Sequence, residues 1–319
     1  SGAMDDYDNS GHTPWYDYKY SDETRITDKI SQVNLNGGMT TVGDYAFASV
    51  KGITAVASGS PEDGSKLKKI GNKAFCYCEN LKAVRIYGNP SLEIIGDEAF
   101  WACRSLASFY IPSTVKKIGR ESFSACALTE IIIPASVTEI GEYAFYGCTG
   151  LTSVTITGEL ENVSQYAFYS CTGIKYVEIS GETSIIKESA FSKWDGITKL
   201  ILGENITTVE KGAFNNCKKI EELTVPISVN LSVGTVNVYS FEEYNSIKKV
   251  NFTKGTGYGY DYPSTSYSYT PWYYSRANEI EVTFEEGIRS IGDRMFQGCN
   301  GLKMDIQQFN LMKDGIKAD

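Results

Sequence analysis

The stretch from Leu128 to Cys148 reads LTEIIIPASVTEIGEYAFYGC. The stretch before it, from Leu106 to Cys126, reads LASFYIPSTVKKIGRESFSAC and carries leucine, isoleucine, proline, valine, glycine, phenylalanine and cysteine in the same slots. Self-similarity at a fixed spacing is the sequence signature of a repeat protein. The chain is therefore expected to consist of one short unit used many times.

The repeat extends over most of the chain. Its marker phenylalanine recurs at a period of about 23 residues, at Phe47, Phe75, Phe100, Phe123, Phe145, Phe168, Phe191, Phe214, Phe241 and Phe296. Only the last interval is about two periods long. A period of this length is typical of a solenoid, in which each unit contacts only its neighbours.

Each unit has two halves with different patterns. In the first half, as at Val154 and Ile156, apolar and polar residues alternate, which indicates a strand with one buried face. The second half, as at Ile140 and Phe145, fits a short return segment that is either a helical turn or a second short strand. One unit cannot bury its own apolar face, so stacked units must share a core beside a parallel sheet.

Phenylalanine and cysteine recur in a register that predicts two internal ladders. The expected phenylalanine ladder comprises Phe75, Phe100, Phe123, Phe145, Phe168, Phe191 and Phe214. Of the 8 cysteines, all but Cys76 lie three residues after a marker phenylalanine, and the expected thiol ladder includes Cys103, Cys126, Cys148 and Cys171. Metal sites need clustered ligands and disulfide frameworks belong to short secreted chains, so buried thiols are favoured. One disulfide between stacked neighbours, such as Cys126 and Cys148, stays an alternative.

The pattern L-x-x-I-x-I-P-x-S-V-x-x-I-G-x-x-A-F-x-x-C resembles the BspA-like (Treponema pallidum-type) bacterial leucine-rich repeat. The resemblance covers residues 28–253 and 278–302. Later units depart from it, because Ser164, Lys187 and Glu210 replace the glycine and Trp194 and Tyr244 replace the cysteine. The resemblance implies a leucine-rich-repeat right-handed superhelix with a parallel β-sheet on one face and short helical or extended return segments. It also implies a bacterial surface or secreted protein that adheres to host matrix proteins, other bacteria or glycans.

Changes in composition divide the chain into four parts. Residues 1–27 combine Ser1–Met4, which looks like the remnant of a cleaved tag, with a Tyr-rich segment expected to cap the array. The other parts are a repeat array over residues 28–253, a Gly-, Tyr- and Ser-rich segment over residues 254–279, and a further repeat with a C-terminal tail over residues 280–319. The segment 254–279 is either a linker between two arrays or a loop of one solenoid.

The composition restricts the function classes. Acidic residues outnumber basic residues 39 to 30, with a net charge of −9, and a phosphate backbone needs a basic face, so no nucleic-acid partner is expected. No apolar run approaches the ~18 residues of a membrane helix, so we expect no membrane insertion. The only histidine is His12, which disfavours histidine-based catalysis and metal binding. We expect no cofactor and a monomeric chain.

The outward-pointing strand positions form the candidate binding surface, because solenoids commonly bind partners on this extended face. The candidates are Arg85, Tyr87, Tyr110, Ile132, Thr155, Tyr176, Glu178 and Ile201, with Thr224 and Asn251 further along the chain. Aromatic residues are enriched in interfaces. Tyrosine and isoleucine also favour strands in general, which is the structural alternative.

We therefore expect a non-catalytic recognition module, extracellular or at the cell surface, that binds an extracellular protein or glycan. A structural spacer within a larger surface protein is the alternative, and it would present a uniformly polar sheet face. A carbohydrate-active enzyme is a third hypothesis. It would require converging carboxylates, which the periodic pattern does not supply.

Overall fold

The computed structural model describes residues 29–35, 38–59, 65–86, 91–157, 162–181, 183–194, 196–210, 212–229, 246–255, 279–288, 296 and 301–304. The chain forms two compact units, Ser1–Thr152 and Ser153–Asp319. The segment 1–27, most of 254–279, the tail from residue 305, Tyr87, Tyr244 and Cys299 lie outside the described residues.

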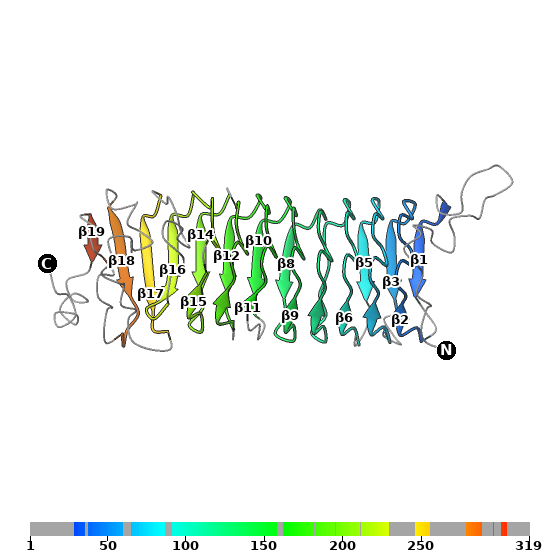
Figure 1. Ribbon diagram of the computed structural model, residues 1–319, viewed down its shortest axis with the longest axis horizontal. Coiled ribbons are helices and arrows are strands. Elements are labelled where there is room, and N and C mark those ends of the chain that lie inside the picture. Colours follow the sequence, from blue (N-terminus) through cyan, green and yellow to red (C-terminus); the bar gives the residue numbers. More distant parts are fainter. Residues whose placement is uncertain are drawn as a thin grey trace. The chain divides into compact units, whose positions relative to one another are not determined.

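The first unit is a parallel β-solenoid built from long and short strands (Figure 1). Its long strands are β1 (Gln32–Leu35), β3 (Ala55–Ser58), β5 (Ala83–Ile86) and β8 (Glu130–Ile133). β1, β3 and β5 pair in parallel, and the next coil joins β5 through a bridge between Ala83 and Ser108. The short strands form a second parallel sheet in the order β2 (Thr41–Val42), β4 (Lys69–Ile70), β6 (Ile94–Ile95), β7 (Lys117–Ile118) and β9 (Glu139–Ile140).

The second unit repeats this arrangement, with short strands described between its first four long strands. Its long strands pair in parallel in the order β10 (Ser153–Ile156), β12 (Tyr176–Ile179), β14 (Lys199–Leu202), β16 (Glu222–Pro226), β17 (Lys249–Thr253), β18 (Ile280–Phe284) and β19 (Leu302–Met304). Its short strands are β11 (Asn162–Val163), β13 (Ile185–Ile186) and β15 (Thr208–Val209). Val154 aligns with Val177, and Val177 with Leu200, so the apolar side chains of successive strands share one face.

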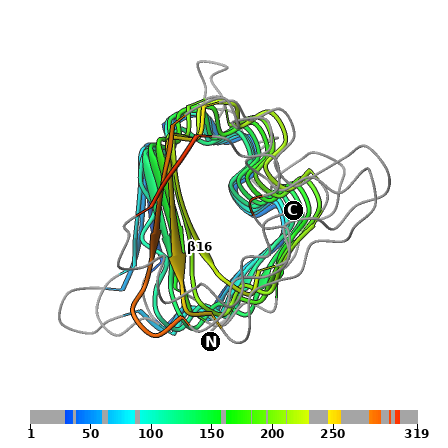
Figure 2. The same ribbon diagram turned by 90° about the vertical axis from the view of Figure 1, so that its left-hand side faces the viewer.

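In cross-section, the long strands lie on one side of each coil and the return segment lies on the other (Figure 2). The predicted fold class, a repeat solenoid with a parallel sheet on one face, is confirmed. The extended alternative holds for the described return segments, since each short strand leads into tight turns and no helix.

In the tight turns, backbone N–H groups donate alternately to the next coil and to the turn itself. In the coil of Phe47, the N–H groups of Tyr45, Phe47 and Ser49 donate to carbonyls of the next coil at 2.7 to 2.9 Å. The intervening N–H groups donate to the carbonyl three residues earlier. Tyr45 and Ser49 have φ of 56° and 62°, a left-handed conformation that is uncommon outside glycine. The inter-coil hydrogen bonds offset this strain because buried backbone groups must be paired.

The marker phenylalanines stack inside each unit. In the first unit, rings Phe47, Phe75, Phe100, Phe123 and Phe145 follow one another at centroid distances of 5.2 to 5.4 Å. In the second unit, Phe168, Phe191 and Phe214 stack at 5.5 and 5.2 Å. These side chains are at most 5% exposed. The stack fills the core with one ring per coil.

The repeat position three residues after each marker phenylalanine, here called the cysteine slot, supplies a side-chain hydrogen-bond donor to the preceding coil. The carbonyl of Phe100 accepts the N–H of Cys103 at 3.1 Å and the thiol of Cys126 at 3.2 Å. The thiol of Cys148 likewise donates to Phe123 O at 3.1 Å, and burial raises its pKa to about 12, so it keeps its proton at neutral pH. The seven described cysteines, Cys171 among them, are buried thiols and not disulfides.

Trp194 shows what the slot requires. It replaces cysteine in the pattern, and its indole N–H donates to Phe168 O at 2.5 Å, the equivalent carbonyl of the preceding coil. Two chemically different side chains therefore meet the same demand, which is a buried donor aimed at the marker carbonyl.

The loop glycine has a steric cause. A Cβ at Gly119 would lie 2.5 Å from the carbonyl carbon of Gly96, closer than real Cβ atoms come to backbone. The N–H of Gly119 donates to Ile95 O at 2.8 Å. Where Glu210 replaces the glycine, its N–H likewise donates to Ile186 O at 2.8 Å, and its side chain forms an ion pair with Lys187 at 3.2 Å. Lys187 N donates to Val163 O at 3.3 Å, so the substitutions at Lys187 and Glu210 both keep this backbone hydrogen bond.

We expect Phe123→Ala to lower the free energy of unfolding of the first unit by about 3–5 kcal/mol, because it empties one ring position in a close-packed stack. Chemical denaturation measures this loss. The exposed substitution Tyr110→Ala is the control and should change the free energy by no more than about 0.5 kcal/mol. Equal effects of the two substitutions would contradict the ladder as the source of stability.

We expect Cys148→Ser to be more stable than Cys148→Ala by about 0.5–1.5 kcal/mol, because only serine keeps a donor to Phe123 O. Chemical denaturation of both variants gives the difference. If alanine is as stable as serine, the slot selects for size alone.

Candidate functional site

The sheet face comprises the outward-pointing side chains of the long strands, and its first unit presents a row that crosses successive coils. Arg85 is exposed on β5. Tyr110 occupies the equivalent position of the next coil, and Ile132 occupies that position on β8. Tyr110 is 74% exposed and Ile132 is 63% exposed, so both present large apolar surface to solvent. Of the four candidates expected here, Tyr87 lies outside the described residues.

In the second unit, the candidate residues are less exposed, and two of them contact each other. Thr155, Glu178 and Ile201 align in one row across β10, β12 and β14, and each is only partly exposed. Tyr176 lies in the neighbouring row, and its hydroxyl donates to Glu178 Oε2 at 2.6 Å. Burial, assisted by Glu178, raises the pKa of Tyr176 to about 12. The Tyr176 hydroxyl and the Glu178 carboxylate therefore form a hydrogen bond with each other within the sheet face.

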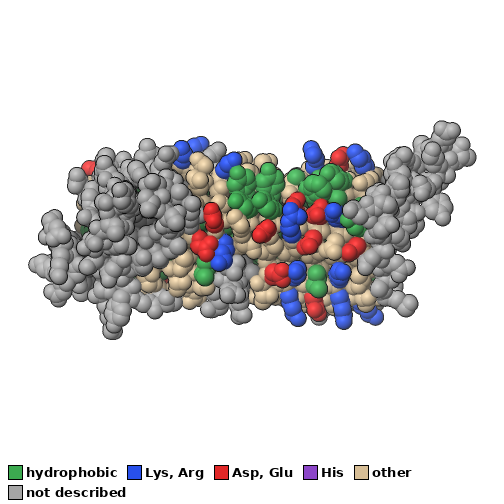
Figure 3. Space-filling model, viewed as in Figure 1, with side chains coloured by type: hydrophobic (Ala, Val, Ile, Leu, Met, Phe, Trp, Pro, Cys, Tyr) green, Lys and Arg blue, Asp and Glu red, His purple; other side chains and the backbone are tan. Residues whose placement is uncertain are grey.

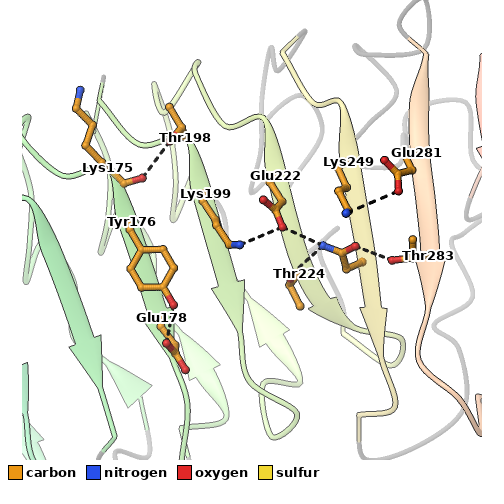
Figure 4. Close-up of polar contacts among 11 residues, drawn as sticks. Lys175, Tyr176, Glu178, Thr198, Lys199, Glu222, Thr224, Lys249, Glu281 and Thr283 are labelled. Carbon is orange, nitrogen blue, oxygen red and sulfur yellow. Dashed lines mark hydrogen bonds and ion pairs between the residues drawn. The ribbon is translucent and has the colours of Figure 1, made fainter.

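Further along, the same face carries a polar lattice, shown in Figure 4. Lys199 and Glu222 form an ion pair at 3.1 Å, and Lys249 and Glu281 form another at 3.7 Å. Asn251 links the strands between them. Its Nδ2 donates to Thr224 Oγ1 at 3.2 Å and to Glu222 Oε1 at 3.4 Å, and its Oδ1 accepts from Thr283 Oγ1 at 2.5 Å.

The sequence prediction named Thr224 and Asn251 of the polar lattice but missed the row of charged residues beside them. The missed row alternates basic and acidic residues at equivalent repeat positions, in the order Lys199, Glu222, Lys249, Glu281 and Lys303. Opposite charges on directly paired strands attract, whereas like charges would repel. This alternation was a readable signal for ion pairs once the repeats were aligned.

A hollow lies on the sheet face of the first unit, with a volume of about 200 Å³. It is lined by Gln32, Val33, Asn34, Ala55, Val56, Ala57 and Arg85. Ala57 lies between Asn34 and Arg85, and Ala55 lies between Gln32 and Ala83, so small outward side chains leave space beside longer ones.

Aromatic side chains also gather on the return side, which the sequence prediction did not consider. In the first unit, Tyr77 packs against Trp101 at a ring-centroid distance of 4.8 Å, and Tyr143 packs against Tyr146 at 5.9 Å. The available signal was a tyrosine or tryptophan within two residues of a marker phenylalanine. Figure 3 shows patches of hydrophobic side chains on a face that otherwise intersperses acidic and basic residues.

Within the part of the chain that the structure describes, no three His, Cys, Asp or Glu side chains are grouped so that they could hold a metal ion. Among the same residues, no helix is long and apolar enough to cross a membrane.

Parallel coils with a long strand on one side, a recurring loop glycine and a phenylalanine ladder define a leucine-rich-repeat solenoid. The family described as BspA type leucine rich repeat region (6 copies) matches residues 25–128, 116–248 and 226–313, and the chain belongs to this family. The resemblance expected from the sequence is therefore confirmed.

Solved structures of bacterial repeat proteins are similar to the chain. A leucine-rich repeat protein from Bacteroides ovatus ATCC 8483 aligns over 86% of this chain and 74% of its own, with 22% identity and a TM-score of 0.50. One from Eubacterium ventriosum ATCC 27560 aligns over 95% and 77%, with 22% identity and a TM-score of 0.48. The T. pallidum leucine rich repeat protein aligns over 59% and 77%, with 24% identity and a TM-score of 0.43. The similarity to the B. ovatus protein shows the fold alone. No curated protein matches the chain.

We expect the Lys199–Glu222 pair to contribute about 0.2–1 kcal/mol to stability, since both side chains are partly exposed to water. A double-mutant cycle with Lys199→Met and Glu222→Gln measures this coupling. High salt should reduce it, because at 1 M ionic strength the screening length falls to about 3 Å. A coupling that does not change with salt would contradict a simple surface ion pair.

Proposed function

We propose that the chain is a non-catalytic recognition module that adheres to a protein or glycan outside the cell. The observation that carries this proposal is the exposed pair Tyr110 and Ile132, which occupies consecutive coils of the sheet face. A solvated face has no need for large apolar side chains at 74% and 63% exposure. Aromatic and apolar anchors of this kind contribute most of the binding energy of protein interfaces.

The polar lattice of the second unit favours a second role for that part of the chain. Lys199 and Lys249 are paired with glutamates, and both the nitrogen and the oxygen of the Asn251 side-chain amide are hydrogen-bonded. Few polar groups of the lattice therefore remain to bind a partner. A face of this kind suits a structural spacer, which holds the recognition surface away from its attachment point. The proposal therefore assigns recognition to the first unit and presentation to the second.

Family membership supports an extracellular or cell-surface location, which we include in the proposal. It also supports a non-enzymatic role, because repeat proteins of this architecture commonly use an extended face for binding. An enzyme that cleaves sugars is less well supported, since it needs two converging carboxylates. The carboxylates of Glu222 and Glu281 are instead paired with lysines on neighbouring strands.

We expect the double substitution Tyr110→Ser and Ile132→Ser to weaken ligand binding at least tenfold, because each anchor typically contributes about 1 kcal/mol or more. The measurement is a binding screen of the purified chain on immobilised fibronectin, fibrinogen, mucin, and bacterial and plant glycans. The melting temperature should change little, because both side chains are exposed. The matched control is Tyr146→Ser on the return side, where the tyrosine is 40% exposed and binding should persist.

Undiminished binding by the double variant would overturn the assignment to the sheet face. Failure of every immobilised ligand to bind the unsubstituted chain would favour the spacer role for the whole molecule.

A further inference from the structure

The hollow on the first unit has the composition of a small polar binding site. Ala55 and Ala57 form its floor, Gln32 and Asn34 project from β1 on one side, and Arg85 projects from β5 on the other. Side chains on a strand stand roughly perpendicular to the sheet, so the methyl group of Ala57 between Asn34 and Arg85 leaves an open space, which Ala55 extends beside Gln32. The space is about 200 Å³, below the roughly 300–1,000 Å³ of pockets for drug-sized ligands. It therefore fits one small unit of a larger ligand.

Arg85 lacks a partner among the residues that the structure describes. Its side chain is exposed and takes part in no hydrogen bond or ion pair there. Along the described outward positions of the first unit, the other charged residue is Glu130, which lies two coils further on. The lysines of the polar lattice differ, because each of Lys199 and Lys249 has a glutamate within 4 Å. The guanidinium of Arg85 is thus available to an anion from outside.

We propose that this hollow binds a carboxylated sugar unit, of the uronic or sialic acid type, within an acidic glycan. The planar guanidinium of Arg85 pairs with the carboxylate through two parallel hydrogen bonds, the geometry that arginine favours. The amides of Gln32 and Asn34 both donate and accept hydrogen bonds, as sugar hydroxyls do. The alanine floor contacts the apolar face of the ring.

The neighbouring coil supports a polymer rather than a free acid. Tyr110 stands beside Arg85 in the same row and is 74% exposed, so a following sugar can lie against its ring. An acidic peptide also carries carboxylates, but its side chain needs neither the hollow nor the pair of amides. The net charge of −9 gives no long-range attraction to an acidic polymer, so the affinity must come from contacts at this site.

This inference rests on the proposed function, because it names the ligand class of the same sheet face. The test titrates the full chain with three probes. They are a uronic acid oligosaccharide, a sialylated oligosaccharide, and the uronic oligosaccharide after reduction of its carboxyl groups to alcohols. An acidic peptide of glutamate and alanine is the fourth arm.

We expect binding to at least one carboxylated oligosaccharide and none to the reduced form. Arg85→Met should weaken this binding at least tenfold by removing the guanidinium. Ala57→Leu should do the same by filling the hollow while leaving every charge in place. Arg104→Met is the matched control, since it removes the same charge from an exposed turn, and it should bind as the unsubstituted chain does.

Equal binding of the reduced oligosaccharide, or full binding by both variants, would overturn the sugar site. Binding to the acidic peptide alone would also overturn it. The proposed function can survive that result. If another immobilised ligand binds the chain and the Tyr110/Ile132 variant loses it, recognition stands and only the sugar assignment falls. If no probe and no immobilised ligand binds, both fall.

Discussion

Hydrogen bonds between successive coils are the constraint on which the rest of the structure depends. A single coil cannot enclose a core, so its buried backbone groups must find partners in the next coil. In the turns around each marker phenylalanine, alternate N–H groups donate to carbonyls of the next coil. This arrangement requires residues such as Tyr45 to adopt a left-handed conformation. The glycine of the loop and the donor of the cysteine slot follow from the same close approach of backbones. Gly119 lies against the backbone of the preceding coil, and the side chains of Cys126 and Trp194 donate to backbone carbonyls of their preceding coils.

This scaffold leaves the outward positions of the strands free to vary, and the two units use that freedom differently. The second unit pairs its charges, as in Lys199 with Glu222, and hydrogen-bonds Tyr176 to Glu178. The first unit leaves Tyr110 and Ile132 exposed and Arg85 without an ion pair among the described residues. Surface ion pairs add little stability, whereas exposed anchors add affinity when they are buried by a partner. The contrast places the proposed recognition site in the first unit.

Repeat spacing makes most of the fold readable from the amino-acid sequence. Val154 and Ile156 alternate with polar residues, and Phe123 and Phe145 keep the same place in successive units, so strand, core and stacking direction all follow. The return segment is ambiguous in sequence because three apolar residues close together fit a helical turn as well as an extended segment. Backbone hydrogen bonds to the next coil resolve this ambiguity, and a single unit of sequence does not contain them.

The candidate surface was only partly predictable, for a physical reason. The alternation of apolar and polar residues determines which side chains point outward, and it correctly predicted that Tyr110 and Ile132 are exposed to solvent. It does not determine what lies beside each of them one coil away. The hollow next to Arg85 exists because Ala57 on β3 aligns with it, and the closed contacts of Tyr176 and Glu222 exist because strand register brings their partners near. The sequence by itself determined the repeat, the strand and the buried ladder, since these depend on local periodicity. The tertiary structure decided which outward groups are satisfied and which are open, since that depends on neighbours separated by a whole coil of chain.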